Sequence, residues 1–310
     1  MRSVTIEEFG GAEVLHVAEA AKPAPANGEV LVRVRAAGVN PIDYKTRAGQ
    51  GVTRSWQGSP FPLILGWDVS GVVEESRALG FKPGDEVYGM VRFPARGSAY
   101  AEYVAAPASD LAPKPRTLDH IHAAAVPLAA LTAWQALFTT AELQPGQTVL
   151  VHAAAGGVGH LAVQLAKWKG TRVIGTCSAR NIDFVKSLGA DQVIDYTRED
   201  FAELVRDVDV VFHTIAANLR AGSFRTLKKG GFLVSITGPV PPEEAAPFGA
   251  RATFVLVRPR ADQLREIAAL VDSGRIRVVI DKTFRLEDAR EAHRHVEGGH
   301  TRGKVVLEVA

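Results

Sequence analysis

Short hydrophobic runs separated by turn-forming residues fill roughly the first 110 positions of the chain, a spacing expected of β-strands. The runs are Val30–Ala36, Gly71–Glu75, Glu86–Val91 and Ala99–Ala105. Turn signals such as Pro25–Gly28 and Pro83–Asp85 lie between them. Many short strands at this spacing are typical of an all-β, barrel-like unit, so the first part of the chain is predicted to be a β domain.

From Leu118 onward the pattern changes to alternating helices and strands. Leu118–Ala141 contains no glycine and is rich in Ala and Leu, so we expect helix there, with Pro127 either starting a second helix or kinking one. The expected strands are Thr148–His152, Arg172–Cys177, Gln192–Ile194, Asp209–His213, Phe232–Ile236 and Thr253–Val257. The expected helices are Val158–Lys169, Asn181–Leu188, Glu199–Arg206, Ala221–Leu227 and Ala261–Asp272. This order predicts a parallel sheet with helices on both faces.

The segment from Arg277 onward is β-rich with one amphipathic helix, Leu286–Val296, and we expect it to return to the first domain. Val240–Pro247 is predicted to be a loop. The predicted domains are residues 1–122, completed by 277–310, and residues 123–276. The predicted fold class is α/β, with a doubly wound parallel-sheet (Rossmann) domain beside the β-barrel domain.

Composition and charge narrow the class of protein. Hydrophobic residues make up 46% and charged residues 23% of the 310 positions, which is typical of a folded globular protein. The net charge is +2 with no Lys/Arg block, so no nucleic-acid partner is expected. A single cysteine, Cys177, excludes an intramolecular disulfide and favours a reducing compartment. No signal-peptide core and no apolar run of the ~18 residues that a membrane span needs are found, so we expect a cytoplasmic protein without a membrane partner.

The strongest local motif runs from Thr148 to Lys167, where an apolar strand enters a turn of small residues and then a helix. Ala154, Gly156 and Gly159 fit the pattern A-x-G-x-x-G, a variant of the dinucleotide fingerprint, with Gly157 and Val158 between them. Small residues there permit a tight turn, close approach of the backbone to a pyrophosphate, and close packing of helix on strand. The alternative is an ordinary glycine-rich loop, but its place within a strand–turn–helix unit predicts dinucleotide binding.

The end of the next strand distinguishes NADPH from NADH. NAD-binding sites usually place an acid about 20 residues after the glycines, to accept a hydrogen bond from the ribose 2′-hydroxyl. Here Ser178 and Arg180 follow the strand, and no carboxylate occurs before Asp183. A hydroxyl and a guanidinium suit a 2′-phosphate, so NADPH is the predicted cofactor. Alternatively, Ser178 caps the next helix and Arg180 is solvated.

These motifs resemble the medium-chain dehydrogenase/reductase superfamily, and within it the zinc-free branch of quinone oxidoreductases and alkenal/enone reductases. Besides the glycine turn, the stretches that carry the resemblance are AAGVNPIDYKTRAG (36–49), LGWDVSGVV (65–73), KPGDEVYG (82–89), AEYV (101–104), AAVPLAALTAWQAL (124–137), SLGADQVIDY (187–196) and RGKVVLEV (302–309). The resemblance implies a GroES-like catalytic β domain, a nucleotide domain, and an active site in the cleft between them.

Zinc ligands are absent where the zinc-dependent members of the superfamily carry them. Asn40 stands in place of a catalytic cysteine, and Trp67 lies near the place of a histidine ligand. One cysteine cannot supply a four-cysteine structural site. The histidines His120, His122, His293, His295 and His300 are expected to be solvated surface residues. We therefore expect no metal.

Without a metal to polarise a carbonyl, substrates that already accept hydride are favoured. The predicted function is an NADPH-dependent oxidoreductase that transfers hydride to a quinone or to an α,β-unsaturated carbonyl. Two different functions stay open beside it: an enoyl-thioester reductase, and a non-catalytic NADPH-binding regulatory protein. The physiological substrate is not predicted.

The resemblance also implies roles for individual residues. Asn40 is expected beside the nicotinamide ribose, with Tyr44 and Lys45 at the cleft. Tyr44 is a candidate to donate a proton to the substrate oxygen, and its alternative is a core tyrosine. Trp56, Trp67 and Phe93 are candidates to line an apolar substrate pocket, or else core residues.

Further residues are expected at the cofactor. Thr132 is expected near the nicotinamide, or else only packs within its helix, and Tyr196 is expected near the 2′-phosphate, or else is buried at the end of its strand. Lys304 is expected at the phosphates, or else is a solvated lysine of the tail. Two loops that follow strands are expected to open onto the ligand crevice, and they contain Ile215, Ala216, Ser235 and Gly238. Thr253–Val257 is predicted to be a sheet-edge strand able to pair across a two-fold axis, which favours a homodimer.

Overall fold

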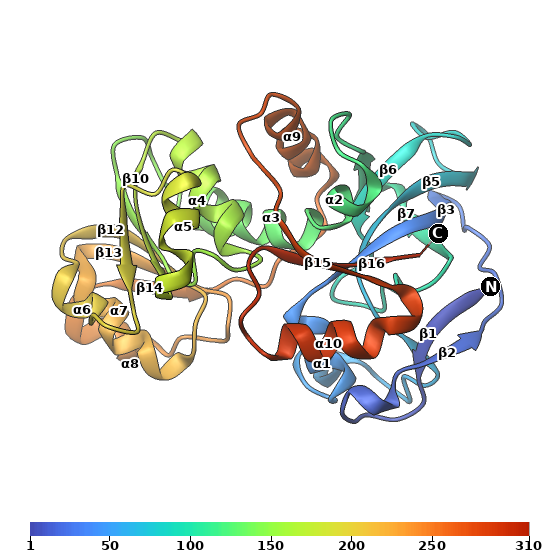
Figure 1. Cartoon of the computed structure of the whole chain (residues 1–310), viewed down its shortest axis with the longest axis horizontal. Helices are drawn as coiled ribbons and strands as arrows, with labels where there is room; N and C mark the ends of the chain where they lie inside the picture. The colour runs from blue at the N-terminus through green and yellow to red at the C-terminus, as the bar shows by residue number, and fades with distance from the viewer. Residues whose placement is uncertain (310) are drawn as a thin grey trace. The chain divides into compact units, whose positions relative to one another are not determined.

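The computed structural model describes residues 1–309 and divides the chain into two compact units (Figure 1). The first unit contains Met1–Leu131, Arg258–Gly274 and the residues from Val278 onward. The second unit contains Thr132–Val257 and Arg275–Arg277. The first unit is therefore assembled from segments far apart in the sequence, whereas the second is almost one continuous segment.

The first unit is built mainly of strands. They are β1 (Arg2–Ile6), β2 (His16–Glu19), β3 (Glu29–Val39), β4 (Leu63–Ile64), β5 (Asp68–Ser76), β6 (Glu86–Met90), β7 (Tyr103–Pro107), β8 (Leu111–Pro113), β15 (Ile280–Arg285) and β16 (Lys304–Glu308). Its helices are α1 (Pro41–Arg47), α2 (His120–Ala124), α9 (Ala261–Asp272) and α10 (Ala289–Glu297). Helix α3 (Pro127–Trp134) begins in this unit and ends in the second.

Strand β3 organises the larger of the two sheets in this unit. Its partners are β5, β7 and β16, all antiparallel, and the sheet order is β15-β16-β3-β5-β6-β8 with β7 also on β3. Val305 of β16 lies opposite Val39 of β3, so the C-terminal segment is part of this sheet. The smaller sheet has the order β2-β1-β4. β-branched residues of β3, among them Val30, Val32 and Val34, are buried in the core, as expected of a central strand.

Helix α9 belongs to the first unit, whereas the boundaries drawn from the sequence put it in the nucleotide domain. The reason is packing against the β domain. The hydroxyl of buried Tyr88 donates to the carbonyl of Leu264 at 2.6 Å, and Thr117 donates to Asp272 through its amide and its hydroxyl. These contacts hold both the first turn and the end of the helix.

The second unit is a parallel sheet covered by helices. Its strands are β9 (Thr148–Val151), β10 (Arg172–Cys177), β11 (Gln192–Asp195), β12 (Val208–His213), β13 (Leu227–Ser235) and β14 (Arg251–Phe254). Its helices are α4 (Gly159–Trp168), α5 (Ile182–Ser187), α6 (Phe201–Leu204), α7 (Arg220–Thr226) and α8 (Pro242–Ala245). The strand order is β11-β10-β9-β12-β13-β14, with every neighbouring pair parallel.

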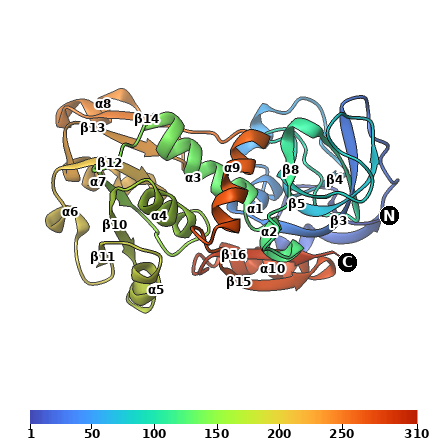
Figure 2. The same ribbon diagram turned by 90° about the horizontal axis from the view of Figure 1, so that it is seen from above.

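In this unit α4 and α5 lie on one side of the sheet, and α7 and α8 on the other (Figures 1 and 2). This is the doubly wound arrangement, because the strand order reverses direction at β9. The carboxyl ends of all six strands meet at one edge, and ligands of such sheets bind where the order reverses. That edge is where the candidate cofactor residues have to be sought.

Several elements differ from those predicted. The helix expected over Leu118–Ala141 is divided into α2, α3 and a π-helical turn at Gln135–Thr140. Of the two expectations for Pro127, the start of a second helix is confirmed, because α3 begins at this residue, which has no amide hydrogen to donate. The loop expected at Val240–Pro247 contains α8. The strand expected from Ala99 begins at Tyr103, because the Ala99 and Tyr100 amides donate outside the ladder, to Gly66 and Leu65.

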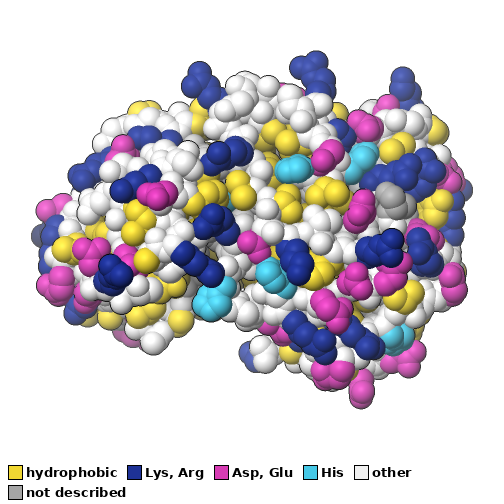
Figure 3. Space-filling view, in the orientation of Figure 1, with side chains coloured by type: hydrophobic (Ala, Val, Ile, Leu, Met, Phe, Trp, Pro, Cys, Tyr) yellow, Lys and Arg dark blue, Asp and Glu magenta, His cyan; other side chains and the backbone are white. Residues whose placement is uncertain are grey.

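Positive and negative side chains are mixed on the face that Figure 3 shows, with no continuous basic tract. Among residues 1–309, no helix has the length and apolarity that crossing a membrane requires.

Candidate active site

The turn between β9 and α4 is held by backbone contacts. The Ala154 amide donates to the Thr176 carbonyl of β10 at 2.9 Å, and the Gly156 amide donates to the Ala153 carbonyl at 2.9 Å. A Cβ on Gly159 would lie 2.1 Å from the oxygen of Ala153. Gly159 is therefore required by the packing of the helix on the turn, as the fingerprint predicts for its third position.

Gly156 differs from Gly159 in what surrounds it. A Cβ there would meet one heavy atom within 4 Å among the described residues, the Ala153 oxygen at 3.3 Å, leaving aside its chain neighbours. Its φ is not in the left-handed region either. Backbone geometry does not require glycine at this position, and packing restricts it much less than Gly159, because only this one tight contact would have to give. Close approach of a pyrophosphate to the backbone would require glycine here. The open side of the turn thus fits a dinucleotide.

Ala153 was not among the predicted site residues. Its φ is +46°, a left-handed conformation that is costly for a residue with a Cβ. Matching the fingerprint on its glycines could not reveal this position, because alanine gives no sign that the turn needs left-handed backbone.

The end of β10 carries Ser178 and Arg180. The Ser178 hydroxyl makes no helix-capping hydrogen bond in the described part of the chain, and it accepts from the Asn181 amide group at 3.3 Å, so the capping alternative is wrong. The Arg180 side chain is on the surface. Tyr196, at the end of neighbouring β11, is 55% exposed, which excludes its alternative as a buried strand-end aromatic.

A carboxylate that sequence reasoning missed also lies at these strand ends. Asp195 pairs with Cys177 across β11 and β10 and is buried. Its Oδ1 accepts from the Thr197 amide at 3.1 Å and hydroxyl at 2.7 Å, and the hydroxyl contact is the main reason that its pKa is lowered. Because this carboxylate holds the following turn, it is not an open acceptor for a ribose hydroxyl.

Two further loops follow β12 and β13 at the same sheet edge. In the first loop Ile215 is partly buried and Ala216 is exposed. In the second loop the Ser235 hydroxyl is buried and donates to the Gly238 carbonyl at 3.0 Å, so it serves the loop itself. The Thr237 hydroxyl donates to the Ile215 carbonyl at 3.0 Å and joins the two loops.

The second unit thus gathers most of the predicted cofactor residues along one edge. Thr132 is buried in α3, at the start of this unit. The others follow β9 to β13: Ala154, Gly156, Gly157, Val158, Gly159, Ser178, Arg180, Tyr196, Ile215, Ala216, Ser235 and Gly238.

In the first unit, Asn40 lies at the start of α1 and is buried. Its side-chain Nδ2 donates to Asp68 Oδ2 at 2.9 Å, and its Oδ1 accepts from the ammonium of Lys304. The same ammonium donates to the Val39 carbonyl at 3.1 Å and lies 3.9 Å from Asp68 Oδ2. The Asn40 side chain is therefore held between the Asp68 carboxylate and the Lys304 ammonium.

Burial shifts the pKa of both charged groups. It raises the pKa of Asp68 to about 6, against the opposing effects of Lys304 and Asn40. It lowers the pKa of Lys304, and the nearby carboxylates Asp68 and Asp43 oppose that shift. Burial thus shifts the pKa of each group toward its neutral form, because both charges are kept out of water.

The structure corrects the expectation for Lys304. A solvated tail lysine is wrong, because the side chain is 3% exposed. Inside the first unit the ammonium contacts Val39 and Asn40, and the contact with the cofactor phosphates stays a prediction. The burial follows from the pairing of β16 with β3, which places Lys304 at the end of a central strand.

Tyr44 and Lys45 lie on α1, beyond Asn40, and both are half-buried. Burial raises the pKa of Tyr44, and Glu297 adds to the shift. A phenol with a raised pKa stays protonated at neutral pH and is able to donate. The alternative of a fully buried core tyrosine is excluded, and the catalytic roles stay predictions.

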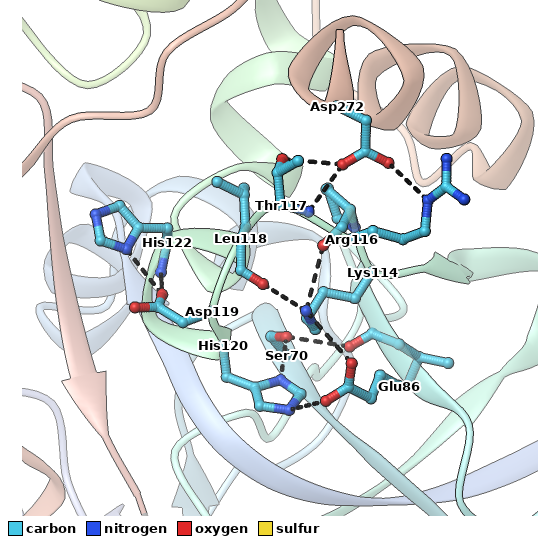
Figure 4. Close-up of polar contacts among 12 residues, drawn as sticks. Ser70, Glu86, Lys114, Arg116, Thr117, Leu118, Asp119, His120, His122 and Asp272 are labelled. Atoms are coloured by element: carbon cyan, nitrogen blue, oxygen red, sulfur yellow. Dashed lines mark hydrogen bonds and ion pairs between the residues drawn. The ribbon is translucent and has the colours of Figure 1, made fainter. Parts of the chain in front are cut away.

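Two of the histidines expected at the surface are packed inside the first unit. His293 is fully buried, so the expectation for it is wrong. Figure 4 shows His120 between Ser70 and Glu86, with Nδ1 2.8 Å from the Ser70 hydroxyl and Nε2 3.3 Å from Glu86 Oε1. His122 is partly exposed beside Asp119, His295 is half-buried against Asp281, and His300 is exposed.

The residues of the first unit do not fit a zinc ion. Asn40 already contacts an ammonium, which would repel a metal cation, and buried Trp67 donates its indole hydrogen to the Ala95 carbonyl at 2.7 Å. Within residues 1–309, no group of three or more His, Cys, Asp or Glu is placed to hold a metal. Trp67 and Phe93 are core residues in edge-to-face contact, and Trp56 is partly buried.

Comparison with known proteins agrees with this geometry. Residues 26–116 match the alcohol dehydrogenase GroES-like domain, and residues 188–307 match the family named zinc-binding dehydrogenase. The NADPH-dependent alkenal/one oxidoreductase of Arabidopsis thaliana chloroplasts is 36% identical, over 99% of this chain and 79% of that protein.

Solved structures match over nearly the whole chain. The quinone oxidoreductase from Coxiella burnetii has a TM-score of 0.93 and 39% identity, covering 100% of this chain and 99% of that one. The Escherichia coli quinone oxidoreductase, solved with NADPH, has a TM-score of 0.89 and 29% identity, with 100% of both chains covered.

The chain belongs to the medium-chain dehydrogenase/reductase family, with relatives among the quinone and alkenal/one oxidoreductases. The predicted family and the predicted fold class, a GroES-like domain with a Rossmann domain, are confirmed.

Proposed function

We propose that this protein is an NADPH-dependent oxidoreductase that delivers hydride to a quinone or to the double bond of an α,β-unsaturated carbonyl. The observation that carries the proposal is the open turn at Gly156, at the carboxyl edge of a doubly wound sheet. The relative named an NADPH-dependent alkenal/one oxidoreductase and the NADPH complex of the Escherichia coli enzyme support the cofactor and the substrate class.

The residues of the second unit would hold the dinucleotide. The first amides of α4 and the backbone at Gly156 face a pyrophosphate, as in other doubly wound sheets. Ser178, Arg180 and Tyr196 lie at adjacent strand ends, where they would contact the adenosine ribose and its 2′-phosphate. When bound, NADPH supplies the hydride.

The residues of the first unit would serve the substrate. Reduction of an enone by hydride consumes one proton at the carbon or oxygen that develops negative charge. The Tyr44 phenol, protonated at neutral pH, is the proposed donor to the substrate oxygen. Asn40, fixed by Asp68 and Lys304, is the proposed polar contact beside the reacting groups.

One experiment separates the candidate functions. NADPH oxidation is followed by absorbance with a naphthoquinone, an alkenal and an enoyl-coenzyme A offered in parallel, beside a calorimetric titration of NADPH. Turnover of the naphthoquinone or the alkenal supports the proposal. Turnover of the thioester alone would instead make the protein an enoyl-thioester reductase, and NADPH binding without any turnover would make it a binding protein.

We also propose a homodimer. Strand β14 is an edge of the parallel sheet, and nearby Leu256 is 46% exposed. An unpaired edge is able to continue the sheet of a second copy across a two-fold axis. Light scattering of the purified protein measures its mass directly. The Val255 amide donates to Ser235 of β13, so the amide of the preceding residue, Phe254, faces the open edge, and Phe254→Pro should shift a dimer toward the monomer.

A cytoplasmic location is proposed from the single cysteine. Cys177 is buried, and burial raises the pKa of its thiol to about 11, so it is a poor partner for disulfide exchange. Fractionation of cells that produce the protein tests the location, and recovery in a membrane or secreted fraction would contradict it.

A further inference from the structure

A chain of buried polar side chains connects α10 to the start of α1. Arg47 Nη1 lies 3.2 Å from His293 Nδ1, and His293 Nε2 lies 3.2 Å from the Tyr100 hydroxyl. That hydroxyl donates to Asp43 Oδ2 at 2.8 Å, and the backbone amide of Asn40 donates to the same oxygen at 2.7 Å. All four side chains of the chain are at most 2% exposed.

The chemistry of the first member gives the hydrogen bonds one direction. A guanidinium has only donors, so His293 Nδ1 must accept from Arg47. Burial beside Arg47 lowers the pKa of His293 to about 3, so the ring is neutral. Its one hydrogen is therefore on Nε2, pointing to the Tyr100 oxygen, and the Tyr100 hydrogen is left for Asp43. Each bond polarises the next toward the carboxylate.

At its far end the hydrogen-bond chain opposes protonation of Asp43. Oδ2 accepts two hydrogen bonds, and Oδ1 has no partner within residues 1–309. A proton on Oδ2 would displace one donor, and a proton on Oδ1 would be buried without an acceptor. Burial nevertheless raises the pKa of Asp43 to about 7, opposed by the Asn40 and Tyr100 contacts.

The charged groups that face Asp43 come from several elements. Asp68 on β5 raises its pKa, and Lys304 on β16 lowers it. Arg47 lies one turn further along α1 and is paired with Glu297 of α10 at 2.6 Å. Burial outweighs the lowering effects, and the Tyr100 hydrogen bond is one of the two contacts that keep the pKa of Asp43 from rising further.

We propose that Arg47, His293 and Tyr100 are positioning residues, whose hydrogen-bond chain keeps Asp43 as the acceptor that anchors the Asn40 backbone and so holds the Asn40 side chain between Asp68 and Lys304. The inference rests on the proposed role of Asn40 in the reductase reaction. It adds a pH dependence to that reaction: protonation of Asp43 loosens the anchor, so turnover falls as the pH drops below about 7.

The test compares pH profiles of kcat/KM for wild type and Tyr100→Phe with NADPH and a naphthoquinone. Loss of a hydrogen bond to the carboxylate raises its pKa, so the variant should be about tenfold slower than wild type near pH 6 and equal to it near pH 9, a shift of about one unit. Tyr103→Phe is the matched control, because Tyr103 lies on β7 against Lys22 and is not part of the hydrogen-bond chain. It should follow wild type at every pH.

A second pair of variants keeps the proposal testable if Tyr100→Phe does not fold. His293→Phe keeps the ring packed edge-to-face on Tyr100 but removes both nitrogens, and it should shift the profile as Tyr100→Phe does. His293→Gln is able to accept from Arg47 and donate to Tyr100, so it should restore the wild-type profile. His295→Gln, on the same helix against Asp281, is the control.

The outcomes separate this inference from the proposed function. Uniform loss of activity at all pH values in folded Tyr100→Phe and His293→Phe, or no loss at any pH, would overturn the positioning role. Asn40→Ala is measured alongside. Full activity of this variant would contradict the proposed role of Asn40 in the reaction. Strong loss in Asn40→Ala together with an alkaline rescue of Tyr100→Phe supports both.

Discussion

A Cβ atom added to Gly175 would lie 2.9 Å from the Cβ of Ala154, so β10 lacks a side chain where the nucleotide turn of the neighbouring strand needs room. Gly159 is likewise confined, by the Ala153 carbonyl. Gly156 is not. Packing therefore requires Gly159 at the turn and Gly175 on the neighbouring strand, whereas it explains Gly156 only in part.

Gly156→Val and Gly159→Val are expected to have opposite consequences. Valine at Gly156 projects into the space assigned to the pyrophosphate, so NADPH affinity should fall more than about tenfold, beyond 1.4 kcal/mol, with little change in melting temperature. Valine at Gly159 collides with backbone and should lower the melting temperature. Calorimetric titration and circular dichroism measure the two effects. A folded Gly156→Val that binds NADPH normally would place the pyrophosphate elsewhere.

NADPH should bind at least tenfold more tightly than NADH, about 1.4 kcal/mol, since one charge-assisted phosphate contact supplies that difference. Arg180→Ala and Ser178→Ala should each reduce this preference while leaving NADH affinity unchanged. Arg172→Ala is the control, because Arg172 is exposed at the opposite end of β10, where it contacts Gln192. Equal affinities for the two cofactors in the wild-type protein would refute the roles of Ser178 and Arg180.

Lys304→Met should lower the free energy of unfolding by about 3–5 kcal/mol at neutral pH, because it leaves the Asp68 carboxylate buried without its cation. Adding Asp68→Asn removes that charge, so the double variant should lose less than the sum of the two single variants. Urea unfolding of all four proteins gives the coupling. Strict additivity would show that the two side chains do not interact.

Turnover is expected to survive exhaustive chelation. The Lys304 ammonium occupies the Asn40 oxygen that a metal cation would need. Trp67 supplies no metal ligand, because its indole nitrogen is a donor to the Ala95 carbonyl. Activity before and after chelation, with metal analysis of the protein, checks this. Loss on chelation and recovery with zinc would contradict the assignment.

Two histidines of the second unit should make it sensitive to acid. Burial lowers the pKa of His152 to about 3 and that of His213 to about 4, while in the unfolded chain both titrate near 6.5. Their neutral forms contribute stability that is complete above about pH 6.5 and is lost as the pH falls toward 4. His213→Gln should show a smaller fall in melting temperature from about pH 7.5 to 5 than wild type. An identical fall in both proteins would argue against a buried neutral His213.

The parts of the fold that sequence reasoning predicted are those encoded locally. The strand–turn–helix unit at Gly156 is recognisable from a stretch of about twenty residues, and each of the parallel strands around it is recognisable from its own local pattern. Ala153 was not predicted, because an alanine in the sequence does not indicate that its backbone is left-handed. The surface position expected for His293, and the alternative of a solvated tail lysine for Lys304, were wrong because both side chains are buried. Their burial depends on the pairing of β16 with β3 and the packing of α10 on α1, contacts between residues more than 240 positions apart.

The same long-range pairing sets an order of assembly during synthesis. The second unit lies almost entirely within Thr132–Val257, so its sheet has all six strands as soon as that stretch has left the ribosome. The first unit, although translated first, lacks the β16 partner of Ala36–Val39 in β3 until the end of the chain emerges, while β5 and β7 already pair with the rest of that strand. Its N-terminal part must therefore wait with an open sheet edge, the state in which a nascent chain is most exposed to aggregation. We therefore expect the inserted nucleotide domain to fold before Val305–Leu307 completes the sheet of the β domain.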